Sequence, residues 1–264
     1  MGSPLPERDT ALLLDVAKTA GEIAMRHFRA DHRVWDKEGG AGPVTEADLA
    51  VDAMLKERLL AARPGYGWMS EETADNTARL DAERVFIIDP IDGTRAFTEG
   101  QESWAHSFAV AVKGEVVAAV IHMPAKGVTY AATRGAGATR NGALIRVSSP
   151  APEGDVSIIT GKPNLSASHW PGGVPPHTRH YRPSIAYRLG LVAEGRYDAM
   201  VTFRPSWEWD IAAGALIVAE AGGEVSDASG KPISFNSPSR LADGTVAAAS
   251  TVYGALMQRM FKAG

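Results

Sequence analysis

The ten residues from Val85 to Thr94, VFIIDPIDGT, are the stretch around which we organise this 264-residue chain. They begin with four apolar, largely β-branched or aromatic residues, which are typical of a buried strand, and they end in turn-forming residues. Two carboxylates, Asp89 and Asp92, stand at this junction. The stretch predicts a strand that delivers two acids to one point, which suits a metal and phosphate site, although an ordinary strand-to-turn junction carries the same residue types.

Composition restricts the class of protein. Apolar residues make up 45% and charged residues 22% of the chain, and no window approaches the roughly 20 apolar residues that a membrane span requires. The formal charge of −4 argues against binding of nucleic acid polymers but permits a small anionic substrate held through cations. Because there is no cysteine, thiolate metal sites and cysteine nucleophiles are excluded. We expect a cytoplasmic protein without a signal peptide or membrane segment.

The first half of the chain predicts two helices and an antiparallel sheet. Apolar residues at helical spacing predict a helix over residues 10–28, with Asp9 or Thr10 as its N-cap. Thr45 and Asp48 fit a capping box that starts a second helix. The other expected elements are a polar, glycine-rich loop over 29–43 and strands over 66–70, 107–112, 116–122 and 128–133.

Near residue 148 the pattern changes to strands that alternate with helices. We therefore divide the chain into an N-terminal α+β half, residues 1–148, and a C-terminal α/β half, residues 149–264. A proline- and glycine-rich loop over 170–176 is expected on the surface. The basic segment from His177 to Arg182 fits either a solvated loop or a receptor for a second phosphate. Strands are expected over 156–160, 197–203 and 245–249, and helices over 184–194, 210–221 and 252–262.

Acidic residues stand where several of these elements begin or end. Glu71 and Glu72 follow one strand, Asp89 and Asp92 follow another, and Asp210 starts a helix. Each of them alone fits an exposed or helix-capping residue. If they converge, their charges repel one another unless cations relieve the repulsion. Carboxylates are hard oxygen ligands that suit Mg²⁺, and two or more such ions can bind a phosphate, activate a water and neutralise the leaving oxygen.

Four motifs resemble, in order and spacing, those of the inositol monophosphatase superfamily. They are residues 42–48 (GPVTEAD), 70–72 (SEE), 89–94 (DPIDGT) and 209–214 (WDIAAG). The resemblance spans roughly residues 10–260 and implies a magnesium-dependent, usually lithium-sensitive phosphomonoesterase. It also implies an α-β-α-β-α layered sandwich, with a largely antiparallel N-terminal sheet and an alternating C-terminal half, and a homodimer.

The resemblance assigns two to three Mg²⁺ ions to the acidic residues. The first ion takes Glu71, Asp89 and the carbonyl oxygen of Ile91 as ligands. The second takes Asp89, Asp92 and Asp210, and Glu71 also touches a third, more hydrated ion. Asp89 is thereby the bridging ligand.

Further roles follow from the same comparison. Asp48 and Thr94 match the pair that orients and deprotonates the attacking water, and Glu71 joins them among the catalytic residues. Gly93 and Thr94 offer backbone N–H groups to the phosphate at a helix start. The remaining positions are a loop lysine near the metals, Lys37, and two residues expected to support the ligands, Glu72 and Thr45.

The substrate depends on fewer residues. Family members that act on inositol phosphates place a glutamate seven residues before the aspartate of the Trp-Asp motif, where this chain has Phe203. Ser70, Arg95 and Glu208 look more like the branch that hydrolyses 3′-phosphoadenosine 5′-phosphate, with Arg95 and Phe203 on the substrate side. Phe203 or Trp207 fits against a base, although core packing suits them as well. Residues 210–218, in contrast, look like the helix of bacterial inositol phosphatases.

These features rank the candidate functions. A 3′(2′),5′-bisphosphate nucleotidase comes first, inositol-1-monophosphatase second and histidinol-phosphate phosphatase third. A catalytically weak regulator that keeps the fold is the alternative from a different class, and the presence of every expected metal carboxylate opposes it. The expected partner is a small phosphate ester.

Overall fold

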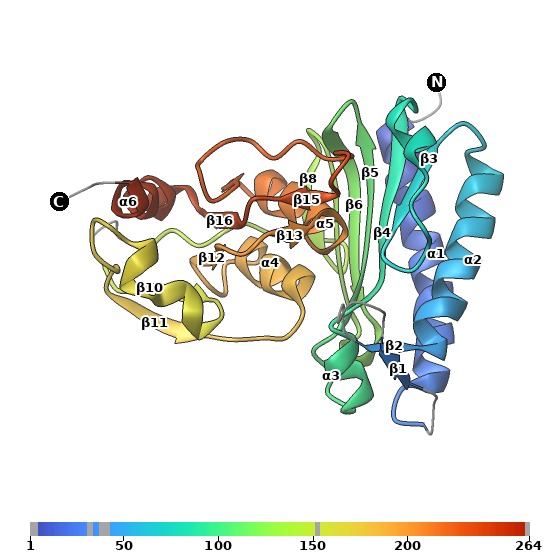
Figure 1. Cartoon of the computed structure of the whole chain (residues 1–264), viewed down its shortest axis with the longest axis horizontal. Coiled ribbons are helices and arrows are strands. Elements are labelled where there is room, and N and C mark those ends of the chain that lie inside the picture. Colours follow the sequence, from blue (N-terminus) through green and yellow to red (C-terminus); the bar gives the residue numbers. More distant parts are fainter. Residues whose placement is uncertain (1–4, 31–33, 37–42, 151–153, 262–264) are drawn as a thin grey trace.

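The computed structural model describes residues 5–30, 34–36, 43–150 and 154–261. Its main elements stack in layers (Figure 1). Helices α1 (Leu5–His27) and α2 (Glu46–Ala62) cover one face of a seven-stranded sheet. Helices α4 (Ile185–Ala193) and α5 (Glu208–Glu220) lie between that sheet and a five-stranded sheet, and α6 (Ser250–Phe261) covers the far side. The predicted α-β-α-β-α sandwich is confirmed.

The seven-stranded sheet comes from the first half of the chain and has the order β3-β4-β5-β6-β7-β8-β9. Its strands are β3 (Gly67–Ser70), β4 (Arg84–Asp92), β5 (Ala105–Val112), β6 (Glu115–Met123), β7 (Val128–Thr133), β8 (Gly137–Arg140) and β9 (Ala143–Leu144). Strands β3 and β4 run parallel, and each later strand is antiparallel to the one before it. The sheet is therefore largely antiparallel, as predicted.

The five-stranded sheet has the order β11-β10-β12-β16-β14. Strand β10 (Val156–Ile159) runs parallel to β11 (His177–His180) and to β12 (Ala199–Thr202). Strand β16 (Thr245–Ala249) is antiparallel to β12 and to β14 (Gly223–Ser226). Because β10, β11 and β12 are parallel, the loops that follow them leave the same edge of the sheet, and the loops after β11 and β12 lead into α4 and α5.

Shorter elements complete the described part of the chain. The strands are β1 (Val34–Asp36), which pairs with β2 (Pro43–Thr45), and β13 (Ser206–Trp207), which pairs with β15 (Leu241–Ala242). The helices are α3 (Thr94–Thr98) and the 3₁₀ turns η2 (Thr77–Leu80), η3 (Pro124–Lys126), η4 (Lys162–Leu165) and η5 (Ala167–His169). Within the described ranges, no helix combines the length and apolar character needed to cross a bilayer.

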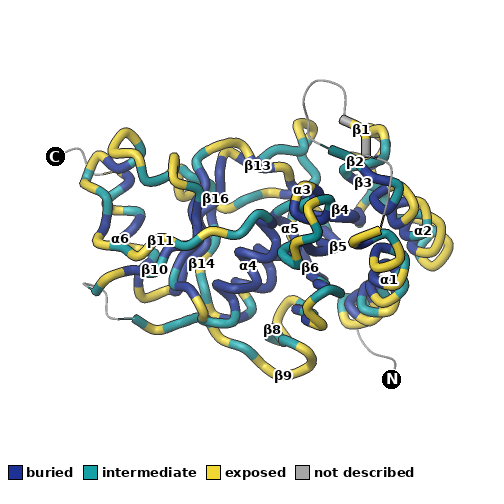
Figure 2. Tube along the Cα trace, turned by 90° about the horizontal axis from the view of Figure 1, so that it is seen from below, coloured by how far each residue is buried: buried dark blue, intermediate teal, exposed yellow. Residues whose placement is uncertain are grey.

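The two halves of the chain share one hydrophobic core. Nearly every residue of α5 from Trp209 to Val218 is buried, as expected for a helix that is apolar on all sides. These residues join α4 and the facing side of the seven-stranded sheet in a single cluster. Figure 2 shows this central region buried, whereas the outer faces of α1 and α2 are exposed. The boundary near residue 148 thus separates two sheets but is crossed by this central cluster, while two further clusters of buried residues each lie within one half.

Two predictions near the N-terminus were wrong. Helix α1 begins at Leu5, so Asp9 and Thr10 lie inside it and are not its N-cap. Asp9 is fully buried and accepts hydrogen bonds from Arg63 Nε, at 2.8 Å, and from Tyr66 Oη, at 2.9 Å. The loop predicted over 29–43 also contains strand β1, which the polar composition concealed.

Two predictions in the second half were also wrong. The loop over 170–176 does not lie wholly on the surface, because Trp170 is 2% exposed and its Nε1 donates to the Asn164 carbonyl at 2.8 Å. Residues His177–His180 of the basic segment form the edge strand β11 and not a loop, although Thr178 and Arg179 are exposed to solvent as predicted. Strand β14 was not predicted, since it is short and begins at a glycine, Gly223.

Gly214 allows α5 to lie against α4. A Cβ at this position would overlap the side chain of Leu189. Gly214→Ala should therefore force the helices apart and destabilise the protein by about 1–3 kcal/mol, which thermal unfolding would show as a lower Tm. Gly254→Ala in α6 is the matched control, because a Cβ there meets nothing within 4 Å, and it should stabilise by about 0.5–1 kcal/mol. An unchanged Tm for Gly214→Ala would contradict this close packing.

Candidate metal site

A β-bulge in β4 brings Asp89 and Asp92 to the same face of the sheet. Asp89 lies opposite Ser107 and Asp92 opposite Ala105, with a register shift between them. Residues three apart in a regular strand point to opposite faces, and the extra residue of a bulge corrects this. The sequence predicted a turn after Asp89, but the strand continues through Asp92. The bulge therefore gives one surface two carboxylates.

A buried histidine on β5 holds this bulge. His106 Nδ1 makes a short hydrogen bond to the carbonyl oxygen of Pro90. A carbonyl oxygen only accepts, so Nδ1 carries the proton. Burial lowers the pKa of His106 to about 3, which keeps the ring neutral. No local sequence pattern marks this role of His106, because the contact depends on the pairing of β4 with β5.

Asp210 completes a cluster of three carboxylates. Asp89, Asp92 and Asp210 each offer one carboxylate oxygen, and these oxygens lie within 4.8 Å of one another. Asp210 stands in the first turn of α5. Ser107 Oγ, on the face that carries the two strand acids, donates to the Trp209 carbonyl at 2.9 Å and so fixes the start of α5 against the sheet. The structure thus brings together three of the predicted ligands.

Burial and mutual repulsion raise the pKa values of these acids. Burial raises the pKa of Asp89 well above its usual range, and the charges of Glu71, Asp92 and Asp210 raise it further. Burial, followed by the charges of Asp92 and Glu71, raises the pKa of Asp210. Burial raises the pKa of Asp92 to about 6, against hydrogen bonds that favour its charged form. Glu71 therefore lies within electrostatic reach of all three acids.

The donor set fits a hard divalent cation. Oδ1 of Asp89 is buried and has no hydrogen-bond partner within the described residues, whereas buried polar atoms are almost always paired. Several carboxylates in one buried place need positive charge to offset their repulsion. Oxygen ligands of this kind suit Mg²⁺ or Ca²⁺ better than softer metals.

A second pair of predicted residues meets beside the cluster. Thr94 Oγ1 lies 3.4 Å from Asp48 Oδ1 and 3.1 Å from the Ile91 carbonyl oxygen. The backbone N–H and the hydroxyl of Thr45 donate to Asp48 Oδ2 at 2.8 and 2.6 Å. The predicted capping box of α2 is confirmed. It holds Asp48 so that its other oxygen faces Thr94.

The start of α4 holds Asp92. Ser184 Oγ and the backbone N–H of Ala186 both donate to Asp92 Oδ2 at 2.6 Å. Gly93, the next residue, has a φ of 94°, which glycine adopts without strain and other residues rarely adopt. Sequence reasoning marked residue 184 only as a helix start and missed its contact with Asp92, which lies 92 positions away in the chain.

The remaining predicted residues lie in different places. Lys37 is outside the described residues. Arg95 is exposed on α3, and the backbone N–H of Glu72 donates to Ser70 Oγ at 3.3 Å. Phe203 packs within the C-terminal half, where its ring stacks on His169 at 4.3 Å between centroids. Because its ring is already stacked on His169, the position of Phe203 does not favour a role in binding a nucleotide base.

Positive charge near the acids comes from two arginines that the sequence did not single out. The charge of Arg188, which is buried, opposes the rise in the pKa of Asp92, and Arg204 is the other. Arg204 is exposed on the loop after β12, and its charge opposes the rise in the pKa of Asp210 that burial causes. The basic segment instead contributes His177 and Arg179 to a hollow of about 750 Å³, which Lys162 also lines. Trp207, also after β12, is 37% exposed and stacks on Trp209 at 4.7 Å.

Comparison with known proteins finds relatives over most of the chain. The family described as "Inositol monophosphatase family" matches residues 6–262. The inositol-1-monophosphatase of Rhizobium meliloti is 35% identical over 216 residues, which cover 76% of this chain and 78% of that protein. The fructose-1,6-bisphosphatase/inositol-1-monophosphatase of Thermotoga maritima is 36% identical over 220 residues, covering 83% and 84%. The solved structure of a Thermotoga maritima IMPase superposes with a TM-score of 0.81 at 30% identity and 96% coverage of both chains.

The raised pKa values predict that Mg²⁺ stabilises the protein more at high pH. Asp92 titrates near pH 6 when folded, above its ordinary value of about 4, so the folded state binds more protons than the unfolded chain between these values. Stability without metal should therefore fall as pH rises through this window. Mg²⁺ replaces the protons, so thermal unfolding should show a larger rise in Tm at pH 8 than at pH 5.

Two variants test the origin of this effect. Asp92→Asn should raise the metal-free Tm at pH 8 and reduce the response to Mg²⁺, because it removes one buried charge. Glu115→Gln, at a residue whose side chain is 71% exposed, should behave as the wild type. An equal Mg²⁺ response at both pH values would refute the assignment.

Proposed function

The chain belongs to the inositol monophosphatase family, whose members hydrolyse phosphate monoesters, and we propose that it does so through water activated by two to three Mg²⁺ ions. The observation that carries the proposal is the meeting of Asp89, Asp92 and Asp210 within 4.8 Å of one another. A catalytic pair, Asp48 and Thr94, stands beside them. A nucleophilic side chain is not needed for this chemistry.

The acids divide between the ions as the family pattern implies. Glu71, Asp89 and the Ile91 carbonyl would hold one ion, and Asp89 would share the other with Asp92 and Asp210. Bound Mg²⁺ lowers the pKa of a coordinated water and neutralises charge on the phosphate. Because the pKa values of Asp89 and Asp210 are raised, an ion has to displace protons from them, so metal binding should strengthen as pH rises.

Asp48 and Thr94 supply the base. The Thr94 hydroxyl can donate to Asp48 Oδ1 or to the Ile91 carbonyl, because it carries a single proton. Engagement of that carbonyl as a ligand would favour donation to Asp48. Thr94 Oγ1 then accepts from the attacking water, whose proton moves to it as the hydroxyl proton moves to Asp48. The Gly93 and Thr94 N–H groups lie at the start of α3, where a phosphate oxygen can accept from them.

We place 3′(2′),5′-bisphosphate nucleotides first among the substrates. Arg204 is exposed and lies within electrostatic reach of Asp210, so its guanidinium could bind a second phosphate of the substrate beside the metals. Trp207 lies three positions before Asp210 and is partly exposed, so a nucleotide base could stack on its ring. Inositol-specific members carry a glutamate where this chain has Phe203. Phe203 has no carboxylate to bind sugar hydroxyls, and its ring packs against His169.

Inositol 1-phosphate is the second candidate, and the names of the relatives favour it. Histidinol phosphate is the third candidate substrate. A non-catalytic regulator that keeps the phosphatase fold is the alternative to an enzyme. Lithium sensitivity, a homodimer and a cytoplasmic location also stay predictions.

Asp210→Asn tests the metal chemistry. The variant should fold, because the amide is isosteric, but kcat should fall by more than about a hundredfold, since even residues that only support a metal ligand are worth 10–100-fold. Steady-state hydrolysis of a phosphate ester in Mg²⁺ measures the loss, and circular dichroism checks the fold. Near-wild-type turnover by the folded variant would overturn the proposal, while Glu115→Gln controls for a general charge effect.

A direct comparison of esters tests the substrate. The value of kcat/KM should be higher for 3′-phosphoadenosine 5′-phosphate than for inositol 1-phosphate or histidinol phosphate. Arg204→Gln should lower the first value by about tenfold or more, because it removes a charged hydrogen bond, and should leave the other two nearly unchanged. A clear preference for inositol 1-phosphate would reverse the ranking and make the enzyme an inositol-1-monophosphatase.

A further inference from the structure

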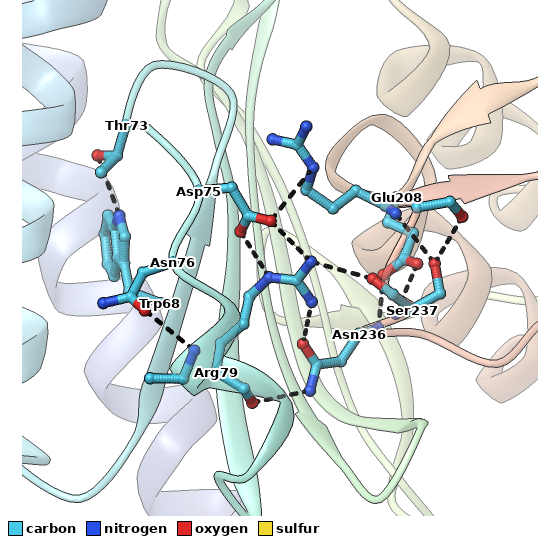
Figure 3. Close-up of polar contacts among 11 residues, drawn as sticks. Trp68, Thr73, Asp75, Asn76, Arg79, Glu208, Asn236 and Ser237 are labelled. Carbon is cyan, nitrogen blue, oxygen red and sulfur yellow. Dashed lines mark hydrogen bonds and ion pairs between the residues drawn. The ribbon is translucent and has the colours of Figure 1, made fainter.

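A buried arginine joins the two halves of the chain (Figure 3). Arg79, in η2, is 2% exposed. Its Nε and Nη2 bind the two carboxylate oxygens of Asp75 at 2.7 and 3.2 Å. Its Nη1 donates to Asn236 Oδ1 at 2.6 Å, and Nη2 also donates to the Ser237 carbonyl at 3.0 Å. One side chain thus links positions 157 or more apart in sequence.

The segment at Asn236 and Ser237 is in turn fixed to the start of α5. The carboxylate of Glu208, fully buried, accepts from the backbone N–H groups of Asn236, at 2.5 Å, and Ser237, at 2.9 Å. Asn236 Nδ2 donates back to the Arg79 carbonyl at 3.0 Å. Figure 3 shows these side chains converging on one cluster. Arg79 is therefore connected to Glu208, two positions before Asp210, through a continuous chain of hydrogen bonds.

On its other side, the cluster fixes the loop that carries Glu71. Asp75 lies four positions after Glu71 and is held by Arg79. The part of the loop near Glu71 is tied to α2, because Ser70 Oγ and Thr73 Oγ1 both donate to Asp52, the latter at 2.6 Å. Glu71 thus lies between two residues tied to Asp52 on α2, and the contact of Asp75 with Arg79 fixes the same loop two residues beyond Thr73.

The geometry points to Arg79 as a positioning residue that sets the separation of Glu71 from Asp210. The two acids come from different halves of the chain, and Arg79 is bonded to the loop of the first and, through Asn236 and Ser237, to the helix start of the second. Metal ligation requires side chains held within about 0.5 Å of their productive positions. Arg79 touches neither ligand and acts through the backbone that bears them.

The inference rests on the proposed function, because it concerns the metal that these acids hold. It is tested with Mn²⁺ alone, which is measured by the electron paramagnetic resonance signal of the free ion and needs no substrate. Arg79→Gln should weaken Mn²⁺ binding by about 10–100-fold, the range found for residues that orient metal ligands. Arg79→Lys, which keeps the charge but loses the two-pronged contact with Asp75, should lie between Arg79→Gln and the wild type.

Activity gives a second measure. Arg79→Gln should need more Mg²⁺ for half-maximal activity, and its kcat should fall while KM at saturating Mg²⁺ stays near the wild-type value. Glu208→Gln breaks the same connection from the side of α5 and should have the same effects, which covers the case that Arg79→Gln fails to fold.

Arg63→Gln is the matched control. It also breaks an ion pair with a buried acid, since Arg63 Nε lies 2.8 Å from Asp9 Oδ1, but it lies outside the Arg79 cluster. It should lower Tm without changing Mn²⁺ affinity. Wild-type Mn²⁺ affinity and Mg²⁺ dependence in folded Arg79→Lys and Glu208→Gln would overturn the inference. A wild-type protein that binds no Mn²⁺ would instead overturn the proposed function itself.

Discussion

The mutual repulsion of carboxylates around the buried Asp89 is the constraint on which the rest of this structure depends. Burial and neighbouring charges raise the pKa values of Asp89 and Asp210, so the folded protein keeps these groups together only with protons or cations between them. A protein that only needed stability would replace them with apolar residues. The arrangement costs stability in the metal-free state, and the cation that we propose for this site would explain it.

The surrounding fold is arranged to offset that repulsion. Four helices begin at or beside the cluster, and each contributes a polar group near its first turn: Asp48 on α2, Thr94 on α3, Ser184 on α4 and Asp210 on α5. Helix N-termini carry partial positive charge, so they favour the acids and a bound phosphate. The bulge in β4 turns both strand acids toward α5, and the Arg79 cluster fixes that helix. Parts of both halves of the chain are therefore needed for one site.

The features that the sequence predicted are those that depend on near neighbours. The capping box of Thr45 and Asp48 and the acids at the ends of elements follow from short local patterns, and the layered fold follows from the resemblance of four motifs to a known family. The bulge does not, because it is defined by the pairing with β5. The contacts of Ser184 with Asp92 and of Arg79 with Asn236 span 92 and 157 positions and leave no local pattern. The burial of Trp170 in a proline- and glycine-rich loop was missed for the same reason.

Equilibrium binding of Mn²⁺ to wild-type protein and to Asp89→Asn tests the central claim most directly. Asp89 is the proposed ligand at both main metal positions, and its buried Oδ1 has no hydrogen-bond partner within the described residues. The wild type should bind at least two ions per chain, and the folded Asp89→Asn variant should lose binding at both positions together. Retention of the full wild-type stoichiometry and affinity by Asp89→Asn would contradict the account.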